Sequence, residues 1–234
     1  MREKIARATK KTDSITWRSH EPSRIETFSD AAFAFAITLI IVSLEVPTKF
    51  HELMETMKGG VSFALCFALL FNIWNSQNVF FRRYGLTDSF TIAINAVLLF
   101  VVLIYTYPLK FLFELITSLP AKQATMIEPG QIQPLMLIYS AGLITIYLLF
   151  FLMYRHAERW AEHLKLTPIE LYETRTNKYM NVICMAIGLV AISMALLVPG
   201  KAGMSGFVYC TFPIAYSTWF GYRGKKRRKL FPKE

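Results

Sequence analysis

Six apolar stretches, each about as long as a helix that crosses a bilayer, dominate this chain. Short polar segments with prolines, glycines and clustered charges separate them. In lipid, a helix satisfies its backbone hydrogen bonds within itself, so each stretch suits a transmembrane helix. We therefore predict an all-α membrane protein with six transmembrane helices per chain, at about 24–46, 59–81, 88–116, 134–154, 179–198 and 203–222.

The charged residues fit this fold class and predict its orientation. Only 18% of the chain is charged, against about a quarter in soluble domains. Most of the 26 Lys and Arg residues lie before the first span, in the turn after the second, in 155–178 and after the sixth; the other side holds only Lys49, Lys58, Lys110, Lys122 and Lys201. The positive-inside rule then predicts that both termini are cytoplasmic.

Three parts follow from this layout. Residues 1–23 are predicted to form a flexible basic arm, 24–222 the membrane domain, and 223–234 a basic tail. The basic residues suit anionic lipid on the cytoplasmic side rather than nucleic acid, because they lie beside membrane spans. We interpret 155–178 as amphipathic interfacial helix around a break at Pro168.

Motifs for other chemistry are missing from the sequence. It holds no P-loop, GxGxxG, HExxH or GxSxG pattern, and its four histidines are scattered outside the predicted spans. It also lacks a TVGYG-type potassium filter loop and an internal repeat. We therefore expect neither an enzyme nor a metal site nor a bound cofactor.

The first span has an unusual polar start. Ser23 and Glu26 fit a capping box, and Ser29 and Asp30 follow within two turns. An ionisable residue at the edge of a span is a functional-site hypothesis by default. At about 100° per residue, one face of this helix presents Phe35, Thr38, Leu39 and Val42, while Ser29 and Asp30 point away from it. Our interpretation is that the apolar face lines an ion pathway and the polar turn anchors the helix.

The polar start also carries a resemblance. Arg24, Phe28, Ser29 and Asp30 match the RxxxFSD signature of the transmembrane protein 175 family, the potassium channels of lysosomes and endosomes, which has shorter bacterial members. The chain resembles the bacterial form over nearly its whole length, through its six spans and through Trp74, Asn95 and Pro108.

The resemblance implies a homotetramer in a bacterial inner membrane, around a central potassium pore that is lined by the first helix and has no re-entrant loop. By position relative to Asp30, the family's hydrophobic constriction falls on Phe35, Leu39 and Val42, and its hydroxyl layer, tied to potassium preference, falls on Thr38. Two departures are visible in the sequence. Phe35 replaces a commonly aliphatic residue, and Gln77 and Asn78 stand where a histidine is frequent, so pH-linked behaviour that depends on that histidine is in doubt.

The leading hypothesis is thus a channel with modest selectivity for potassium over sodium. Narrow apolar collars block ions by dewetting, and a ring of Thr38 hydroxyls replaces hydration water at less cost for potassium. The plain alternative for the stripe is helix packing, with Thr38 bonded to the Ala34 carbonyl. For the anchor, we expect Asp30 to accept hydrogen bonds or charge from donors on the first three spans. The predicted helix-anchoring network comprises Arg24, Phe28, Ser29, Asp30, Trp74, Asn78 and Asn95.

Other readings stay open at this stage. Ser29 and Asp30 could simply cap the helix at the interface. A proton- or ion-coupled secondary transporter needs charge near the midplane, whereas Glu45 and Glu114 lie near outer ends. A non-conducting membrane scaffold would use the basic arm and tail as partner sites.

Overall fold

The computed structural model describes residues 17–19, 21–42, 48–117, 126–198 and 202–231. All regular structure in these ranges is helical. The α-helices are α2 (Arg24–Val42), α3 (Phe50–Tyr84), α4 (Ser89–Thr117), α6 (Ile132–Arg159), α7 (Pro168–Leu197) and α8 (Phe212–Leu230), with 3₁₀ helices η1 (Pro129–Gln131) and η2 (Ala202–Thr211). The end of the predicted first span, 43–46, and most of the basic arm lie outside the described residues.

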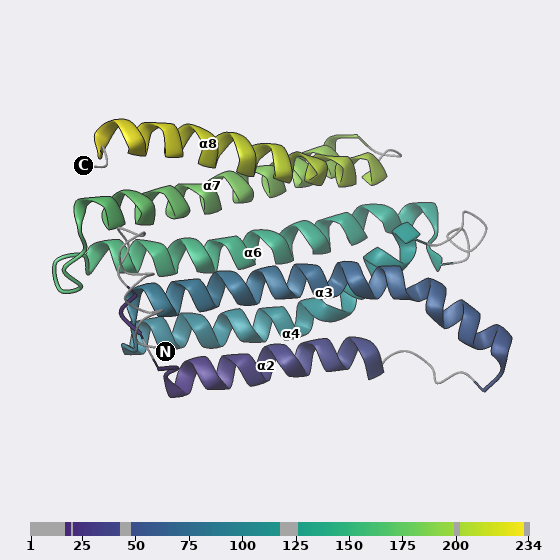
Figure 1. Cartoon of the computed structure of the whole chain (residues 1–234). Coiled ribbons are helices and arrows are strands. Elements are labelled where there is room, and N and C mark those ends of the chain that lie inside the picture. The colour runs from purple at the N-terminus through teal and green to yellow at the C-terminus, as the bar shows by residue number, and fades with distance from the viewer. Residues whose placement is uncertain (1–16, 20, 43–47, 118–125, 199–201, 232–234) are drawn as a thin grey trace.

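The helices form one elongated bundle with α2 and α8 at opposite edges (Figure 1). Helix α4 packs against α2, α3 and α6 and so joins α2 to the rest of the bundle. Helix α7 packs on α6, and η2 and α8 return along α7. The start of α2 and the end of α8 therefore lie at the same end of the bundle.

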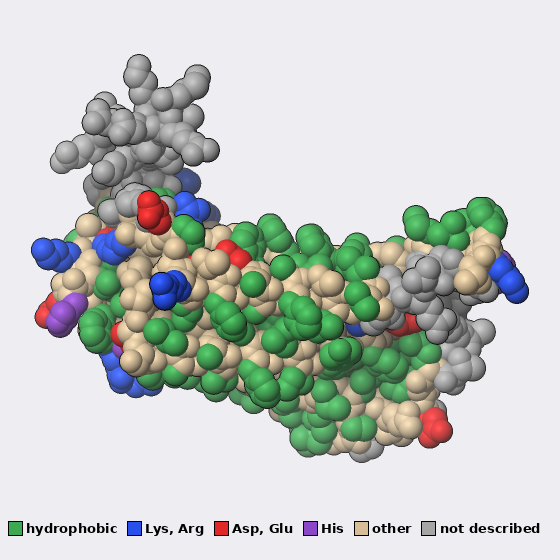
Figure 2. Space-filling model, turned by 90° about the horizontal axis from the view of Figure 1, so that it is seen from below, with side chains coloured by type: hydrophobic (Ala, Val, Ile, Leu, Met, Phe, Trp, Pro, Cys, Tyr) green, Lys and Arg blue, Asp and Glu red, His purple; other side chains and the backbone are tan. Residues whose placement is uncertain are grey.

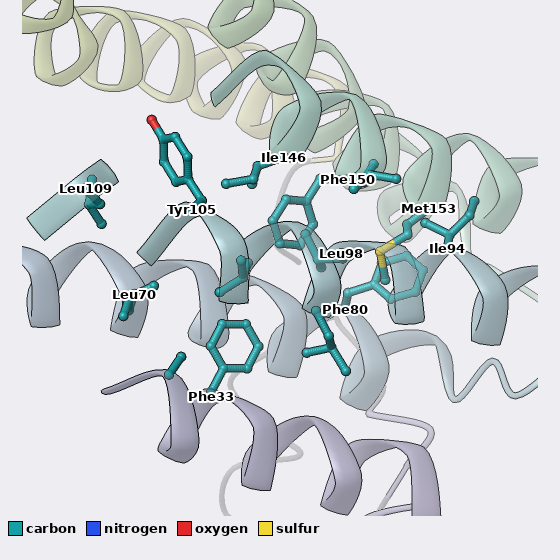
Figure 3. Close-up of a cluster of buried hydrophobic side chains, with 14 of the residues drawn as sticks. Phe33, Leu70, Phe80, Ile94, Leu98, Tyr105, Leu109, Ile146, Phe150 and Met153 are labelled. Atoms are coloured by element: carbon teal, nitrogen blue, oxygen red, sulfur yellow. The ribbon is translucent and has the colours of Figure 1, made fainter. Parts of the chain in front are cut away.

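The core of the bundle is apolar and aromatic. Figure 3 shows Phe33 of α2 and Phe80 of α3 facing Leu98 of α4, with Ile146 and Phe150 of α6 beyond. These side chains are at most 4% exposed. Between transmembrane helices, tight side-chain packing rather than the exclusion of water supplies much of the stability of the bundle. This core fixes where α2 lies relative to α3 and α4.

Two helix starts carry reciprocal caps. At α2, the Glu26 carboxylate accepts from the Ser23 backbone N–H at 3.0 Å, and the Ser23 hydroxyl accepts from the Glu26 N–H at 3.4 Å, which confirms the predicted capping box. At α7, Thr167 and Glu170 form the same arrangement, with Pro168 at the first turn. Each box satisfies backbone donors that a helix start leaves free.

The segment 155–178 differs from its predicted form. It contains no separate interfacial helix: α6 continues to Arg159, a turn follows, and α7 begins at Pro168, so the predicted break is a helix start. The reason is that this segment's charges pair between the two helix ends. Arg175 and Lys178 of α7 both contact the Glu158 carboxylate of α6. The polar residues are therefore divided between the end of α6, a turn and the start of α7.

The sixth span is also built differently. Five helices of the described chain are long and apolar enough to cross a membrane, which supports a multi-pass membrane protein. The predicted span 203–222 is instead divided between η2 and α8. Pro213 lies in the first turn of α8, where its missing N–H is tolerated but cannot continue an α-helical ladder from η2. Helix α8 then runs to Leu230, so the predicted tail is helical over its described first part.

Candidate functional site

Helix α2 has two distinct faces. Toward α3 and α4 it buries Glu26, Ser29, Phe33, Ala36 and Ile40, at the three- and four-residue spacing of one helical face. The opposite face is turned away from the subunit's own core. Figure 2 shows this side of the molecule, with hydrophobic side chains along its length and most of the visible Lys and Arg side chains at the end where α2 begins.

The exposed face has a heptad stripe. Phe28, Phe35 and Val42 are 67%, 56% and 73% exposed. Thr38 is exposed as well, and Leu39 is half-buried at the edge of the stripe. The structure thus places the four predicted pore residues on a face that the subunit itself leaves largely uncovered. Ser29 and its neighbours lie on the other face, which packs against the core.

The Thr38 hydroxyl donates to the Ala34 carbonyl at 2.8 Å. This is the i−4 bond that ordinary helix packing also predicts. The bond uses the hydroxyl's only hydrogen, so the oxygen keeps lone pairs that can coordinate a cation or accept from water. Bonded in this way, Thr38 can present an acceptor and no donor.

A buried chain of polar side chains holds α2 against its neighbours. The Asn95 amide of α4 donates to the Ser29 hydroxyl at 2.9 Å, and the Gln77 amide of α3 donates to the Asn95 carbonyl oxygen at 2.8 Å. Ser29 in turn donates to the Ile25 carbonyl at 2.7 Å. All three side chains are at most 2% exposed. Buried polar groups are costly unless hydrogen-bonded, so this chain fixes the register of three helices.

Asp30 takes part in a separate contact beside this chain. The Trp74 indole N–H of α3 donates to the Asp30 carboxylate at 2.7 Å. Asp30 and Asn78 also line a polar hollow of about 290 Å³ at the start of α2. The structure brings neither Arg24 nor Phe28 into the anchoring contacts, because both side chains are exposed. Phe28 lies seven residues before Phe35, so it belongs to the exposed stripe.

The segment before α2 is fastened to the rest of the bundle. The Arg18 guanidinium binds both oxygens of the Glu170 carboxylate, at 3.1 and 2.9 Å. It also donates to the carbonyls of Leu164 and Arg83, at 3.0 and 3.2 Å. Glu170 is fully buried at the start of α7. This part of the predicted flexible arm is therefore docked, and Arg18 joins the approach to α2 with α3 and α7.

Asp88, at the turn between α3 and α4, has a lowered pKa. Partial burial opposes ionisation of Asp88, but hydrogen bonds from Thr91 and the nearby His156 outweigh it and lower the pKa of the carboxyl. The Thr91 hydroxyl donates to Asp88 at 2.6 Å. An ionised Asp88 thus stabilises the first turn of α4 through its N–H groups and the helix dipole.

Two contributors were missed by the sequence reasoning. Gln77 lies among several amides of the second span, and helical projection alone does not tell which of them meets Asn95. Arg18 lies in a segment without apolar periodicity, and its partner Glu170 is far away in sequence. The Thr167–Glu170 capping pattern could have marked Glu170 as ordered, but it does not identify Arg18. Among the described residues, no cluster of three or more His, Cys, Asp or Glu side chains could hold a metal ion.

Comparisons with known proteins bear on this arrangement. The model of the family described as endosomal/lysosomal potassium channel TMEM175 matches residues 24–105, which include α2 and its anchors on α3 and α4. A potassium channel of Marivirga tractuosa is 33% identical over 231 residues, covering 93% of this chain and 94% of that protein.

Solved structures give the same picture. The crystal structure of the potassium channel MtTMEM175 T38A variant, in complex with a nanobody–MBP fusion protein, has a TM-score of 0.79 and 33% identity, covering 92% of this chain and 98% of that one. A lysosomal potassium-selective channel TMEM175 homolog from Chamaesiphon minutus has a TM-score of 0.59 at 22% identity, covering 89% and 99%, and is similar in fold.

Proposed function

The chain belongs to the TMEM175 family of potassium channels, and from this premise we propose that it conducts potassium across a bacterial inner membrane. Four copies surround a central axis, with α2 of each copy lining the pore. Potassium is the permeant ion, and the proposed activity is transport and not an enzymatic reaction. The basic end of the bundle, where α2 begins and α8 ends, faces the cytoplasm, as the charge distribution predicts.

The uncovered stripe on α2 is the observation that carries this proposal. A single subunit leaves Phe35 and Val42 more than half exposed, while it buries the opposite face of the same helix through hydrogen bonds and apolar contacts. A helix at the edge of a monomer in lipid could show the same exposure. The family membership, together with the polar anchor on the opposite face, favours a pore axis on the exposed side.

The stripe suggests how such a pore closes and selects. Rings of Phe35, Leu39 and Val42 make apolar collars, which dewet and block ions when narrow. Thr38 lies between the first two collars and contributes four hydroxyl oxygens whose hydrogens are already used within the helix. Oxygen lone pairs replace part of an ion's hydration shell. Since potassium is less strongly hydrated than sodium, such a ring favours potassium modestly.

The anchoring contacts suit this role by holding α2 in place. Ser29 and Asp30 bind Asn95 and Trp74, respectively, on the face away from the stripe. Their function is then structural support for the pore helix and not ion contact. Replacing Asp30 with Ala is expected to reduce assembly more than selectivity.

Single-channel recording of the purified protein in potassium and sodium gradients tests the proposal. We expect a potassium current in the wild type, a lower potassium preference in Thr38→Val, which keeps the side-chain shape without the oxygen, and near-wild-type preference in Thr38→Ser. Flux that saturates with ion concentration like a carrier would favour a transporter. A reconstituted, folded protein without flux would support a scaffold. Equal ion preference in all three proteins would refute the role of Thr38.

A further inference from the structure

Two adjoining hollows run along α8 toward the basic end of the bundle. The larger, of about 560 Å³, is lined mainly by apolar side chains of α3, α6, α7 and α8, among them Ala68, Phe150 and Tyr216. The smaller, of about 260 Å³, is lined by α7 and α8 and contains Arg223, Arg227 and Arg228. Phe220 lines both hollows. The apolar hollow, which we call the groove, and the cationic hollow, which we call its mouth, thus meet at Phe220.

The mouth of this groove carries an excess of positive charge. Glu173 is the only acidic residue among those that line it, and it contacts Arg227 of α8 and, at 3.5 Å, Arg83 of α3. Arg223 is held by a 2.9 Å bond to the Thr176 hydroxyl and lies over the Tyr172 ring. Arg228 is exposed. Arg223 is thus held in place, and Arg223 and Arg228 together present positive charge to one negative group.

The position of the groove indicates which molecule fills it. Figure 1 places α8 at the edge of the bundle opposite α2, and these two helices are not in contact. In a tetramer with α2 at the axis, α8 therefore lies at the periphery, next to lipid; this placement rests on the proposed function. We propose that the groove holds an acyl chain of an anionic phospholipid, with its phosphate against Arg228 and Arg223.

The acyl chain and the headgroup of the lipid contribute differently to the free energy of binding. An acyl chain that leaves bulk lipid for an apolar groove gains little, because both surroundings are equally apolar. Preference for this lipid over its neighbours therefore comes from the headgroup charge. A basic residue near a membrane surface contributes about 1 kcal/mol toward an anionic lipid, which corresponds to about a fivefold change in affinity.

Native mass spectrometry of the purified channel tests the site. The protein is titrated with dioleoyl phosphatidylglycerol and with dioleoyl phosphatidylcholine, which share acyl chains and differ in net charge. We expect phosphatidylglycerol to bind preferentially. Arg228→Gln should weaken phosphatidylglycerol binding about fivefold and phosphatidylcholine binding less, because the choline cation offsets the charge of the phosphate that both lipids share. Lys229→Gln is the matched control, because it removes the same charge from the next residue, which lies about 100° further around α8 and does not line the mouth of the groove.

A third variant separates the groove from the basic surface. Ala68→Phe fills the apolar part without altering charge, and it should weaken both lipids. Equal losses in Arg228→Gln and Lys229→Gln would overturn the proposal in favour of diffuse attraction by the basic helix. A change of oligomer mass in Ala68→Phe, with lipid binding unaffected, would instead assign the groove to contact between copies. Since no current is measured, failure of the channel function would not affect these outcomes.

Discussion

Replacing Arg18 with Ala should destabilise the bundle far more than its place outside the predicted spans suggests. The substitution removes both hydrogen bonds to the Glu170 carboxylate and those to the Leu164 and Arg83 carbonyls. Glu170 is completely buried and keeps a 2.9 Å bond from the Thr167 N–H. Its negative charge would therefore remain buried without the Arg18 guanidinium.

The burial of Glu170 sets the size of the expected loss of stability. Removing one partner of a buried ion pair costs about 3–5 kcal/mol. The Arg18 side chain is 18% exposed, so water can reach the vacated space and we take the lower end, about 3 kcal/mol. For a chain of this size, 1 kcal/mol shifts the melting temperature by about 2–4 °C, which gives a decrease of about 6–12 °C.

Thermal unfolding in detergent, followed by intrinsic tryptophan fluorescence, measures this shift. Arg159→Ala is the matched control, because Arg159 is an exposed arginine at the end of α6, near the same turn. Arg18→Lys keeps the charge without the bidentate geometry and should fall between wild type and Arg18→Ala. Adding Glu170→Gln to Arg18→Ala should recover part of the loss, since no buried charge remains. A melting temperature for Arg18→Ala equal to that of Arg159→Ala would refute this reasoning.

Three further substitutions probe other parts of the bundle. Gly142→Ala would place a Cβ 2.3 Å from the Tyr105 ring, so we expect a loss of about 1–3 kcal/mol in the free energy of unfolding, measured as a lower melting temperature. Gly130→Ala is the control, because its Cβ would meet open space and should leave the melting temperature unchanged. Asn95→Ala leaves its buried glutamine partner unpaired at a cost of about 1–3 kcal/mol, and should reduce the assembled fraction in size-exclusion chromatography; an unchanged profile and melting curve would argue against the anchor. Because folding lowers the pKa of Asp88, its ionised form stabilises the fold above about pH 4, and this contribution is lost as pH falls through the lowered value. Asp88→Asn should therefore melt below wild type at pH 7 and match it in strong acid, and a difference that persists there would contradict the linkage.

The parts of the fold that the sequence predicts well are those set by local pattern. Apolar length locates the five membrane-length helices, and the Ser23–Glu26 pattern locates the start of α2. Helical periodicity also separates Ser29 from Phe35, since that separation needs only the helix itself. The Trp74–Asp30 bond is among the expected pairings, whereas Asn95, expected to donate to Asp30, donates to Ser29 instead.

The features that escaped prediction depend on tertiary contacts. The Arg18–Glu170 pair joins residues 152 positions apart, and no local pattern relates them. The helical state of 155–178 follows from ion pairs between α6 and α7, while composition alone suggested an interface. The last span is divided into η2 and α8. Pro213 is a local signal for this division, but the packing of η2 on α6 and α7 involves residues far away in the sequence and could not be predicted from it.

The two ends of α2 are held by different kinds of contact, and this bears on how a pore could open. Its first two turns are fixed by directional bonds of Ser29 and Asp30, and by the docked segment before them. Further along, Phe33, Ala36 and Ile40 pack into the buried apolar core. Apolar contacts are non-directional, whereas breaking a buried hydrogen bond costs about 1–3 kcal/mol. We therefore expect α2 to pivot about its anchored start, so that the stripe moves more than the anchor. Spin labels at Thr27 and Ile41 should then report a wider spread of inter-subunit distances at Ile41, and equal spreads would contradict the pivot.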